Sequence, residues 1–316
     1  MAFLIRQTLI YSIPLMIVAL AGIFAERSGV INLALEGIMI FGAFCGVLIV
    51  RIFQSAGIFD AIKASGTWLG FQGYLILAML FAAACGAAFS LLLFFVRLLA
   101  NQNVLLLLNG DSASWFMIKK TMLGFDKKAD LGVLGEAFLN KVYLTTYVCI
   151  LIFVILSVIL YKTRFGLRLR ACGENPQAAA SLGINVVKMR YIGVTISGAL
   201  AGMGGFVYAV TTANCSANGD VAGFGFLALA VMIFGNWKPL NVAGGALLFG
   251  LFKCVAASYS TLDINGDGVY ALAELGINSS FYRLLPYLIT LLVLAFTSKS
   301  SRAPKAEGIP YDPGKR

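Results

Sequence analysis

The stretch "DINGDGVYALAE" has the residue types and spacing of a calcium-binding loop. Side-chain oxygens stand at its positions 1, 3, 5 and 12, from Asp263, Asn265, Asp267 and Glu274. Position 6 is a glycine, which suits the sharp turn of such a loop, and Val269 at position 7 offers its carbonyl. The alternative is a metal-free turn, because Asp, Asn and Gly favour turns in any case. The full ligand pattern favours calcium with a structural role.

A second set of polar residues lies within or beside apolar segments, where an ionisable side chain is costly and often functional. Asn32 and Glu36 are four residues apart and would share one helix face. Either they contribute to a polar path, or Glu36 caps or pairs within a broken helix near the membrane edge. Transport sites are commonly built from broken helices, and polar residues surround one interrupted segment: Asn101, Asn109 and Asp111.

An aromatic residue, Phe224, follows the polar stretch 211–220 and is flanked by glycines in "AGFGF". An aromatic ring beside a polar loop can stack on a nucleobase. The alternative is that Phe224 is ordinary membrane core. Both interpretations stay open at the level of sequence.

No residue pattern indicates an enzyme. The chain has 316 residues and no histidine, and no nucleophile–base pair is apparent. Its six cysteines show no spacing typical of a disulfide framework or a zinc site. A G-x-x-x-x-G-K-[ST] phosphate loop is also missing from the sequence. We therefore expect no bound ATP on this chain.

Membrane helices must position these residues. Of all residues, 60% are hydrophobic and 12% are charged, and the mean hydropathy is +0.89, whereas soluble domains carry about a quarter charged residues. Apolar blocks near the ~20 residues of a spanning helix predict an all-α polytopic membrane protein with about 8–10 transmembrane segments, some broken or re-entrant. The segments expected are 7–25, 30–50, 74–98, 101–118, 143–161, 189–210, 222–236, 240–259 and 284–298.

The basic residues indicate sidedness, because Lys and Arg favour the cytoplasmic side. The net charge of +10 is clustered beside the spans, which indicates membrane lipid and not nucleic acid as the partner. We expect 162–190 and the tail 299–316 in the cytoplasm, and 260–283 outside as an EF-hand-like loop. Counting back through the segments puts the N-terminus outside. Residues 1–316 form a single transmembrane domain, since no linker separates two halves.

The run "SGALAGMGG" at 197–205 places Gly198 and Gly202 four residues apart. These residues would lie on the same face of a helix. Small residues at this spacing let two helix backbones approach closely, so we expect tight helix packing here.

The polar segment "KTRFGLRLRACGENPQAAASLGINVVKMR" lies between two apolar segments. Asn175 suits the N-cap of a helix, Pro176 its first position and Gly183 the residue after its end. The residues between them favour a short surface helix with a flat face of Ala178, Ala179 and Ala180 with Leu182. The alternative is an ordinary basic loop with an incidental helix.

Four stretches resemble permeases of ABC importers in the branched-chain amino acid, simple-sugar and nucleoside group. They are "TRFGLRLRACGENPQAAASLGINVVKMRYIGVTISGALAGMGG", "ERSGVINLALEGIMIFGAF", "FGFLALAVMIFGNWKPLNVAGGALLFGL" and the tail "PYDPGKR". They cover most of the chain in the expected order. The start "ERSG" and the tail favour the nucleoside or simple-sugar branch over the amino-acid branch. We expect a nucleoside permease, with a simple-sugar permease as the alternative.

The resemblance implies a type II-like permease in the plasma (inner) membrane of a prokaryote. It implies that the middle segment docks on a separate cytoplasmic ABC ATPase, which binds the ATP, and that an external substrate-binding lipoprotein delivers the substrate. A second permease completes the path, and a heterodimer is favoured over a homodimer. The residues implied in ATPase coupling are Glu174, Asn175, Pro176, Ala178, Ala179, Leu182 and Gly183.

A self-contained transporter of another class is the competing hypothesis. Such a secondary transporter or channel would use Glu36 or Asp111 as a proton or ion site. Transport by the purified chain with an ion gradient and no ATP would favour it. A neighbouring gene for an ATPase with the phosphate loop would favour the importer.

The calcium loop makes the first testable prediction. Replacing Asp263 and Glu274 together with Ala removes two ligands, so we expect a lower melting temperature than wild type in calcium but not in chelator. Calcium that leaves the wild-type melting temperature unchanged would contradict the site.

Overall fold

Long helices make up almost all of the chain that the computed structural model describes, namely residues 1–58, 68–91, 106–107, 117–119, 132–213, 216–217, 221–260, 278–297 and 302–312. The helices are α1 (Ala2–Arg27), α2 (Leu35–Ser55), α4 (Trp68–Leu91), α6 (Gly132–Leu139), α7 (Leu144–Lys162), α8 (Arg164–Glu174), α9 (Pro176–Ser181), α10 (Val186–Thr211), α11 (Phe224–Phe234), α12 (Pro239–Ser258) and α14 (Ser279–Thr297). The strands are β1 (Leu106–Leu107), β2 (Met117–Ile118), β3 (Val142–Tyr143) and β4 (Ser216–Ala217).

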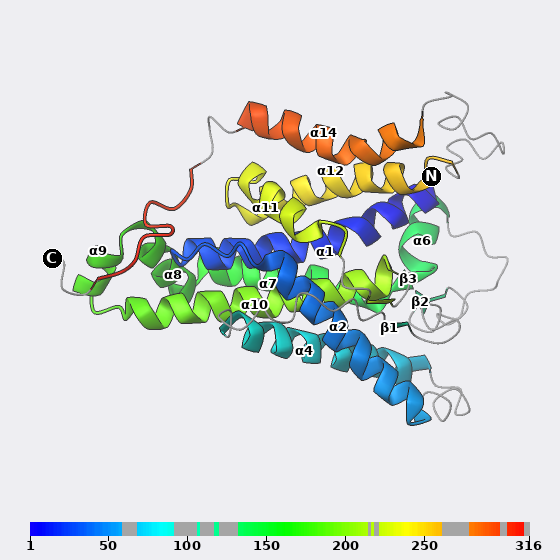
Figure 1. Ribbon diagram of the computed structural model, residues 1–316, viewed down its shortest axis with the longest axis horizontal. Helices are drawn as coiled ribbons and strands as arrows, with labels where there is room; N and C mark the ends of the chain where they lie inside the picture. The colour runs from blue at the N-terminus through cyan, green and yellow to red at the C-terminus, as the bar shows by residue number, and fades with distance from the viewer. Residues whose placement is uncertain are drawn as a thin grey trace.

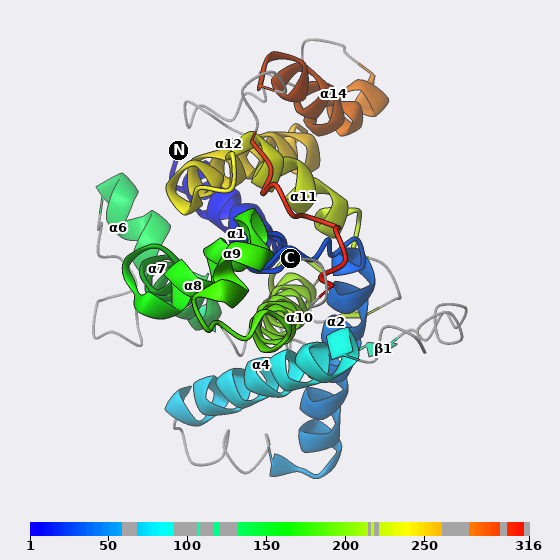
Figure 2. The same cartoon turned by 90° about the vertical axis from the view of Figure 1, so that its left-hand side faces the viewer.

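Six of the described helices, α1, α2, α4, α7, α10 and α12, are long and apolar enough to cross a membrane. A bilayer offers no partner for backbone polar groups, so an apolar segment must satisfy them within a helix. Helices α1, α10 and α12 run along the long axis of the bundle, whereas α2 and α4 are strongly inclined to it (Figures 1 and 2). The all-α polytopic class is therefore confirmed.

The break between the first two helices differs from the expected span over 30–50. Helix α1 ends in a turn in which Gly29 has a φ of +91° and the amide of Val30 donates to the Ala25 carbonyl at 3.1 Å. Only glycine adopts this left-handed conformation without strain. The side chain of Asn32 then accepts from the Ala34 amide at 3.2 Å, and α2 begins at Leu35.

The expected span over 101–118 is wrong at the residues that the structure describes there. Leu106 and Leu107 pair with Ala217 and Ser216 in one antiparallel ladder, β1 with β4. Met117 and Ile118 pair with β3 in a second ladder. Their backbone hydrogen bonds run between segments and not along a helix, so these residues cannot belong to a spanning helix.

Helix α10 lies at the centre of the bundle and packs against α1, α2 and α4 (Figure 2). Its glycines make this possible, because a Cβ on Gly198, Gly202 or Gly205 would meet backbone atoms of Gly86, Ala82 or Met39. The predicted close packing at Gly198 and Gly202 is confirmed. The core continues into α1, whose residues from Ile17 to Ala21 are fully buried.

The two chain ends lie at opposite ends of the bundle (Figure 1). Helices α8 and α9 and the C-terminal segment share one end, while the N-terminus and α6 lie at the other. The first end carries exposed basic residues, among them Arg164, Arg168 and Lys188. The positive-inside rule predicts that this end faces the cytoplasm, and the placement of the N-terminus outside stays a prediction from sequence.

The packing of α10 makes a testable prediction. Gly202→Ala would push a methyl group to within 2.5 Å of the Ala82 carbonyl, and we expect a loss of about 1–3 kcal/mol, as for other overpacked cores. The matched control is Gly73→Ala on α4, where a Cβ meets nothing within 4 Å, so it should be neutral or stabilising by about 0.5–1 kcal/mol. Thermal unfolding in detergent measures both, and equal melting temperatures would contradict the packing argument.

Candidate translocation path and coupling surface

The short helix expected in the polar middle segment is present as α9. The Asn175 side chain accepts from the Ala178 amide at 3.1 Å, and Pro176 is the first helical residue. Gly183 has a φ of +78°, and the amides of Gly183 and Ile184 donate to the carbonyls of Ala180 and Ala179. The sequence signals for the start and end of this helix are therefore confirmed.

The exposed face of α9 differs from the expected one. Ala179 is only 2% exposed and Pro176 is also buried, so both pack inward against this chain. Leu182, by contrast, is 81% exposed, although it is apolar. The correction has a simple cause: six residues of helix make fewer than two turns, and Ala179 lies on the side that holds the helix to the bundle. The outward face is made by Gln177, Ala178, Ser181 and Leu182.

A second helix in the same segment, α8, was not predicted. Its N-cap is Thr163, whose hydroxyl accepts from the Gly166 amide at 3.3 Å, a signal that sequence reasoning could have used. The guanidinium of Arg170 lies 4.6 Å from the ring centre of Tyr161 on α7. The Tyr161 hydroxyl donates to the Trp237 carbonyl at 2.5 Å. Helix α8 is thus linked to the turn between α11 and α12.

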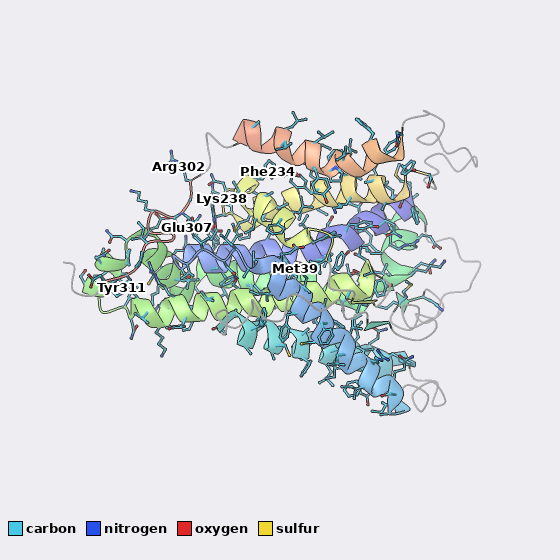
Figure 3. All side chains as sticks on the ribbon, in the orientation of Figure 1. Met39, Phe234, Lys238, Arg302, Glu307 and Tyr311 are labelled. Atoms are coloured by element: carbon cyan, nitrogen blue, oxygen red, sulfur yellow. The ribbon has the colours of Figure 1, made fainter. Side chains whose placement is uncertain are left out.

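The end of α8 is anchored to α1 and to the C-terminal segment. Glu174 forms an ion pair with Arg27 at 3.2 Å, and the Gly173 carbonyl accepts from the Ala306 amide at 2.8 Å. The C-terminal segment continues over this end of the bundle (Figure 3, where Glu307 and Tyr311 are labelled). It also bonds to the α11–α12 turn, where Arg302 donates its amide to the Asn236 side chain at 3.0 Å.

Asn32 does not share a helix face with Glu36, because it precedes the first residue of α2. Its amide donates to the Ser197 hydroxyl at 2.9 Å, and its side chain is 3% exposed. Asn32 therefore joins the α1–α2 break to α10. Its contacts are structural and leave little surface for a substrate.

Glu36 caps the start of α11. One carboxylate oxygen accepts from the Gly223 amide at 3.1 Å, and the other from Gly225 at 2.5 Å and Phe226 at 3.2 Å. Backbone amides at a helix start carry a partial positive charge, so a carboxylate is stabilised there. These contacts match the alternative in which Glu36 caps a broken helix, but not its expected place near the membrane edge.

The cap lies deep in the bundle and not at its edge. Asn32 bonds to Ser197 and Met39 packs on Gly205, both well inside α10. Glu36 lies between Asn32 and Met39 in sequence, so it is at a similar depth. A helix that starts at this depth is the arrangement from which transporter sites are built.

Phe224 is not available for stacking. Its side chain is 1% exposed, and its ring lies 4.8 Å from the ring of Tyr208 and 4.9 Å from the Lys253 ammonium. The exposed ring next to the cap belongs to Phe226, which is 63% exposed. Lys253 was missed at the sequence level, although a lone basic residue inside the apolar helix 239–258 is a recognisable signal.

The remaining candidates lie outside the described residues. These are the polar residues of the interrupted segment and the calcium loop: Asn101, Asn109, Asp111, Asp263, Asn265, Asp267, Val269 and Glu274. Their roles stay predictions from sequence.

Comparison with known proteins gives full-length matches. The family model described as the permease component of the branched-chain amino acid transport system matches residues 4–294. The guanosine ABC transporter permease NupQ of Bacillus subtilis is 38% identical over 100% of this chain and 98% of its own length. The nucleoside ABC transporter permease NupC of Lactococcus lactis is 36% identical over 98% and 96%. A further L. lactis nucleoside ABC transporter permease, NupB, is 30% identical over 51% of this chain and 44% of its own length. No solved structure is a significant match.

These matches agree with the six long apolar helices of the described chain. The family consists of transport components and not of enzymes, and the described helices make the chain a multi-pass protein of the prokaryotic plasma membrane. The ion-coupled alternative loses its support, because the family works as one component of a transport system. The chain therefore belongs to the family of branched-chain amino acid transport system permease components.

Proposed function

We propose that this chain is the permease subunit of an ATP-driven importer of nucleosides. The supporting observation is the full-length similarity to two permeases named for guanosine and for nucleosides. A simple-sugar substrate is the outcome that would overturn this choice.

The site geometry supports a path for a polar substrate carrying an aromatic base. The start of α11 lies at mid-depth, and its amide groups donate hydrogen bonds to the Glu36 carboxylate. Beside them Phe226 exposes most of its ring, and a base can stack on any exposed aromatic face. Because an external binding protein selects the substrate, the path needs only weak polar and stacking contacts.

The coupling surface is formed by the outward face of α9. Leu182, which is 81% exposed, and its neighbours would insert into a groove of a cytoplasmic ABC ATPase, as the resemblance of this segment to the coupling region of ABC importer permeases implies. Closure of two ATPase domains would then move α8 and α9 as a rigid body and tilt the spans that they join.

A second, different permease would complete the path. Two nucleoside permeases of L. lactis match this chain, NupC along nearly all of it and NupB along half. The existence of two such relatives in one strain supports a heterodimer. An external substrate-binding lipoprotein and the ATPase complete the complex.

Leu182→Glu tests the coupling surface. A charge at this apolar contact should reduce co-purification of the ATPase about tenfold, equivalent to ~1.4 kcal/mol of binding, while the melting temperature of the permease stays unchanged. Leu240→Glu is the matched control, because Leu240 is 84% exposed and lies at the start of α12, away from α9. Equal co-purification of both variants and wild type would contradict the assignment.

Uptake by the complete complex in proteoliposomes tests the substrate. We expect labelled guanosine or other nucleosides to accumulate inside when ATP is supplied at the ATPase side. Pentoses and hexoses are the comparison substrates. Accumulation of sugars alone would refute the proposal, as would transport that needs an ion gradient and no ATP.

A further inference from the structure

One peptide unit in the break before α11 is held by two opposite charges. The Gly223 amide donates to the Glu36 carboxylate at 3.1 Å. The Ala222 carbonyl, at the other end of the same peptide unit, accepts from the Lys253 ammonium at 3.3 Å. The anion therefore lies at the positive end of this peptide dipole and the cation at its negative end.

This arrangement brings two ionisable side chains of the spanning bundle to one peptide unit. A charge in a membrane helix is costly unless it is paired or bonded to backbone groups. Glu36 on α2 and Lys253 on α12 come from different helices, and the peptide between them transmits their attraction. Each side chain compensates the charge of the other.

The held peptide is in an unusual conformation. Ala222 has a φ of +50°, which a residue with a side chain rarely adopts, and Gly223 has a φ of +71°. The conformation of Ala222 is strained and persists only where the surroundings impose it, whereas glycine adopts a positive φ readily. Here the surroundings are the carboxylate on one side and the ammonium on the other.

Lys253 also joins three helices. Its ammonium lies 4.9 Å from the ring centre of Phe224 on α11 and 5.5 Å from that of Tyr287 on α14. A cation over an aromatic face gains more when it is removed from water. Helix α14 packs on the outer side of α11 and α12 (Figures 1 and 2), so this contact lies where the three helices meet.

The other end of α11 is linked to the coupling region. The Trp237 indole donates to Glu26 on α1 at 2.6 Å. The backbone carbonyl of Trp237 accepts from the Tyr161 hydroxyl, and the guanidinium of Arg170 on α8 lies over the Tyr161 ring. Helix α11 thus extends from the turn next to α8 to the charged break at mid-depth. A movement of α8 would reach the break through this short helix.

We propose that Lys253 is a positioning residue for transport, which acts with Glu36 through the Ala222–Gly223 peptide to set the start of α11. The pair holds the break in one of two arrangements, and movement of the coupling region through α11 changes which one is populated. The transport readout of this inference rests on the proposed function; the coupling between the two side chains does not.

The test is a double-mutant cycle with Glu36→Gln, Lys253→Met and both together. Each single variant removes one of the two side chains that hold the Ala222–Gly223 peptide, so we expect transport at saturating substrate to fall about tenfold or more. Both changes together should cost clearly less than the product of the two. Lys253→Arg should keep most activity because it keeps the charge. The matched control is Lys238→Met, an exposed lysine at the cytoplasmic start of the same helix (labelled in Figure 3), which should transport like wild type.

Two outcomes would overturn the inference. One is wild-type transport by Lys253→Met; the other is a double variant whose loss equals the product of the single losses. The number of substrate molecules carried per ATP separates positioning from folding, because a misfolded fraction lowers both rates equally, whereas a mispositioned α11 lowers transport more than hydrolysis. If the wild-type complex carries no nucleoside, the proposed function fails, but the same cycle measured by thermal unfolding in detergent still decides whether the side chains are coupled.

Discussion

The carboxylate of Glu36 on the start of α11 is the interaction on which the central arrangement depends. Helix α11 has eleven residues, about 16 Å at 1.5 Å per residue, which is too short to cross a bilayer. It therefore begins inside the bundle, where its first amide groups still need hydrogen-bond partners. Glu36 accepts from three of them. Without this side chain the break would expose polar backbone groups within the membrane.

Close packing around α10 also helps to hold Glu36 at the start of α11. Glycines on α10 let the backbones of α2 and α4 approach it directly, so the start of α2 is held at a fixed depth. That depth determines where Glu36 meets α11. Asn32, just before α2, adds a hydrogen bond to Ser197 on α10. Helix packing and the polar cap thus depend on each other.

Sequence predicts those features that local rules control. Most spans, the small residues of α10, and the caps of α9 at Asn175, Pro176 and Gly183 could be predicted, because each depends on a few neighbouring residues. The inward side of Ala179, the burial of Phe224 and the position of Asn32 outside α2 could not, because contacts with distant helices determine them. For Glu36, the sequence allows a capping role to be predicted but not its partners, because these lie nearly two hundred residues away in sequence. Lys253 was missed for the same reason, since only the fold brings it to the Ala222 carbonyl.

The cytoplasmic end of α11 completes the argument for why a short helix can remain within the bundle. The Asn236 amide donates to the Ile233 carbonyl at 3.0 Å, and the Trp237 amide to the Met232 carbonyl at 3.2 Å. This is the bonding of a Schellman turn, with Asn236 in the left-handed conformation at a φ of +51°. The last carbonyls of α11 are therefore satisfied by its own chain, whereas the first amides need Glu36. The backbone of α11 is therefore satisfied locally at the end linked to the coupling region, whereas at mid-depth it depends on a side chain from a distant part of the sequence.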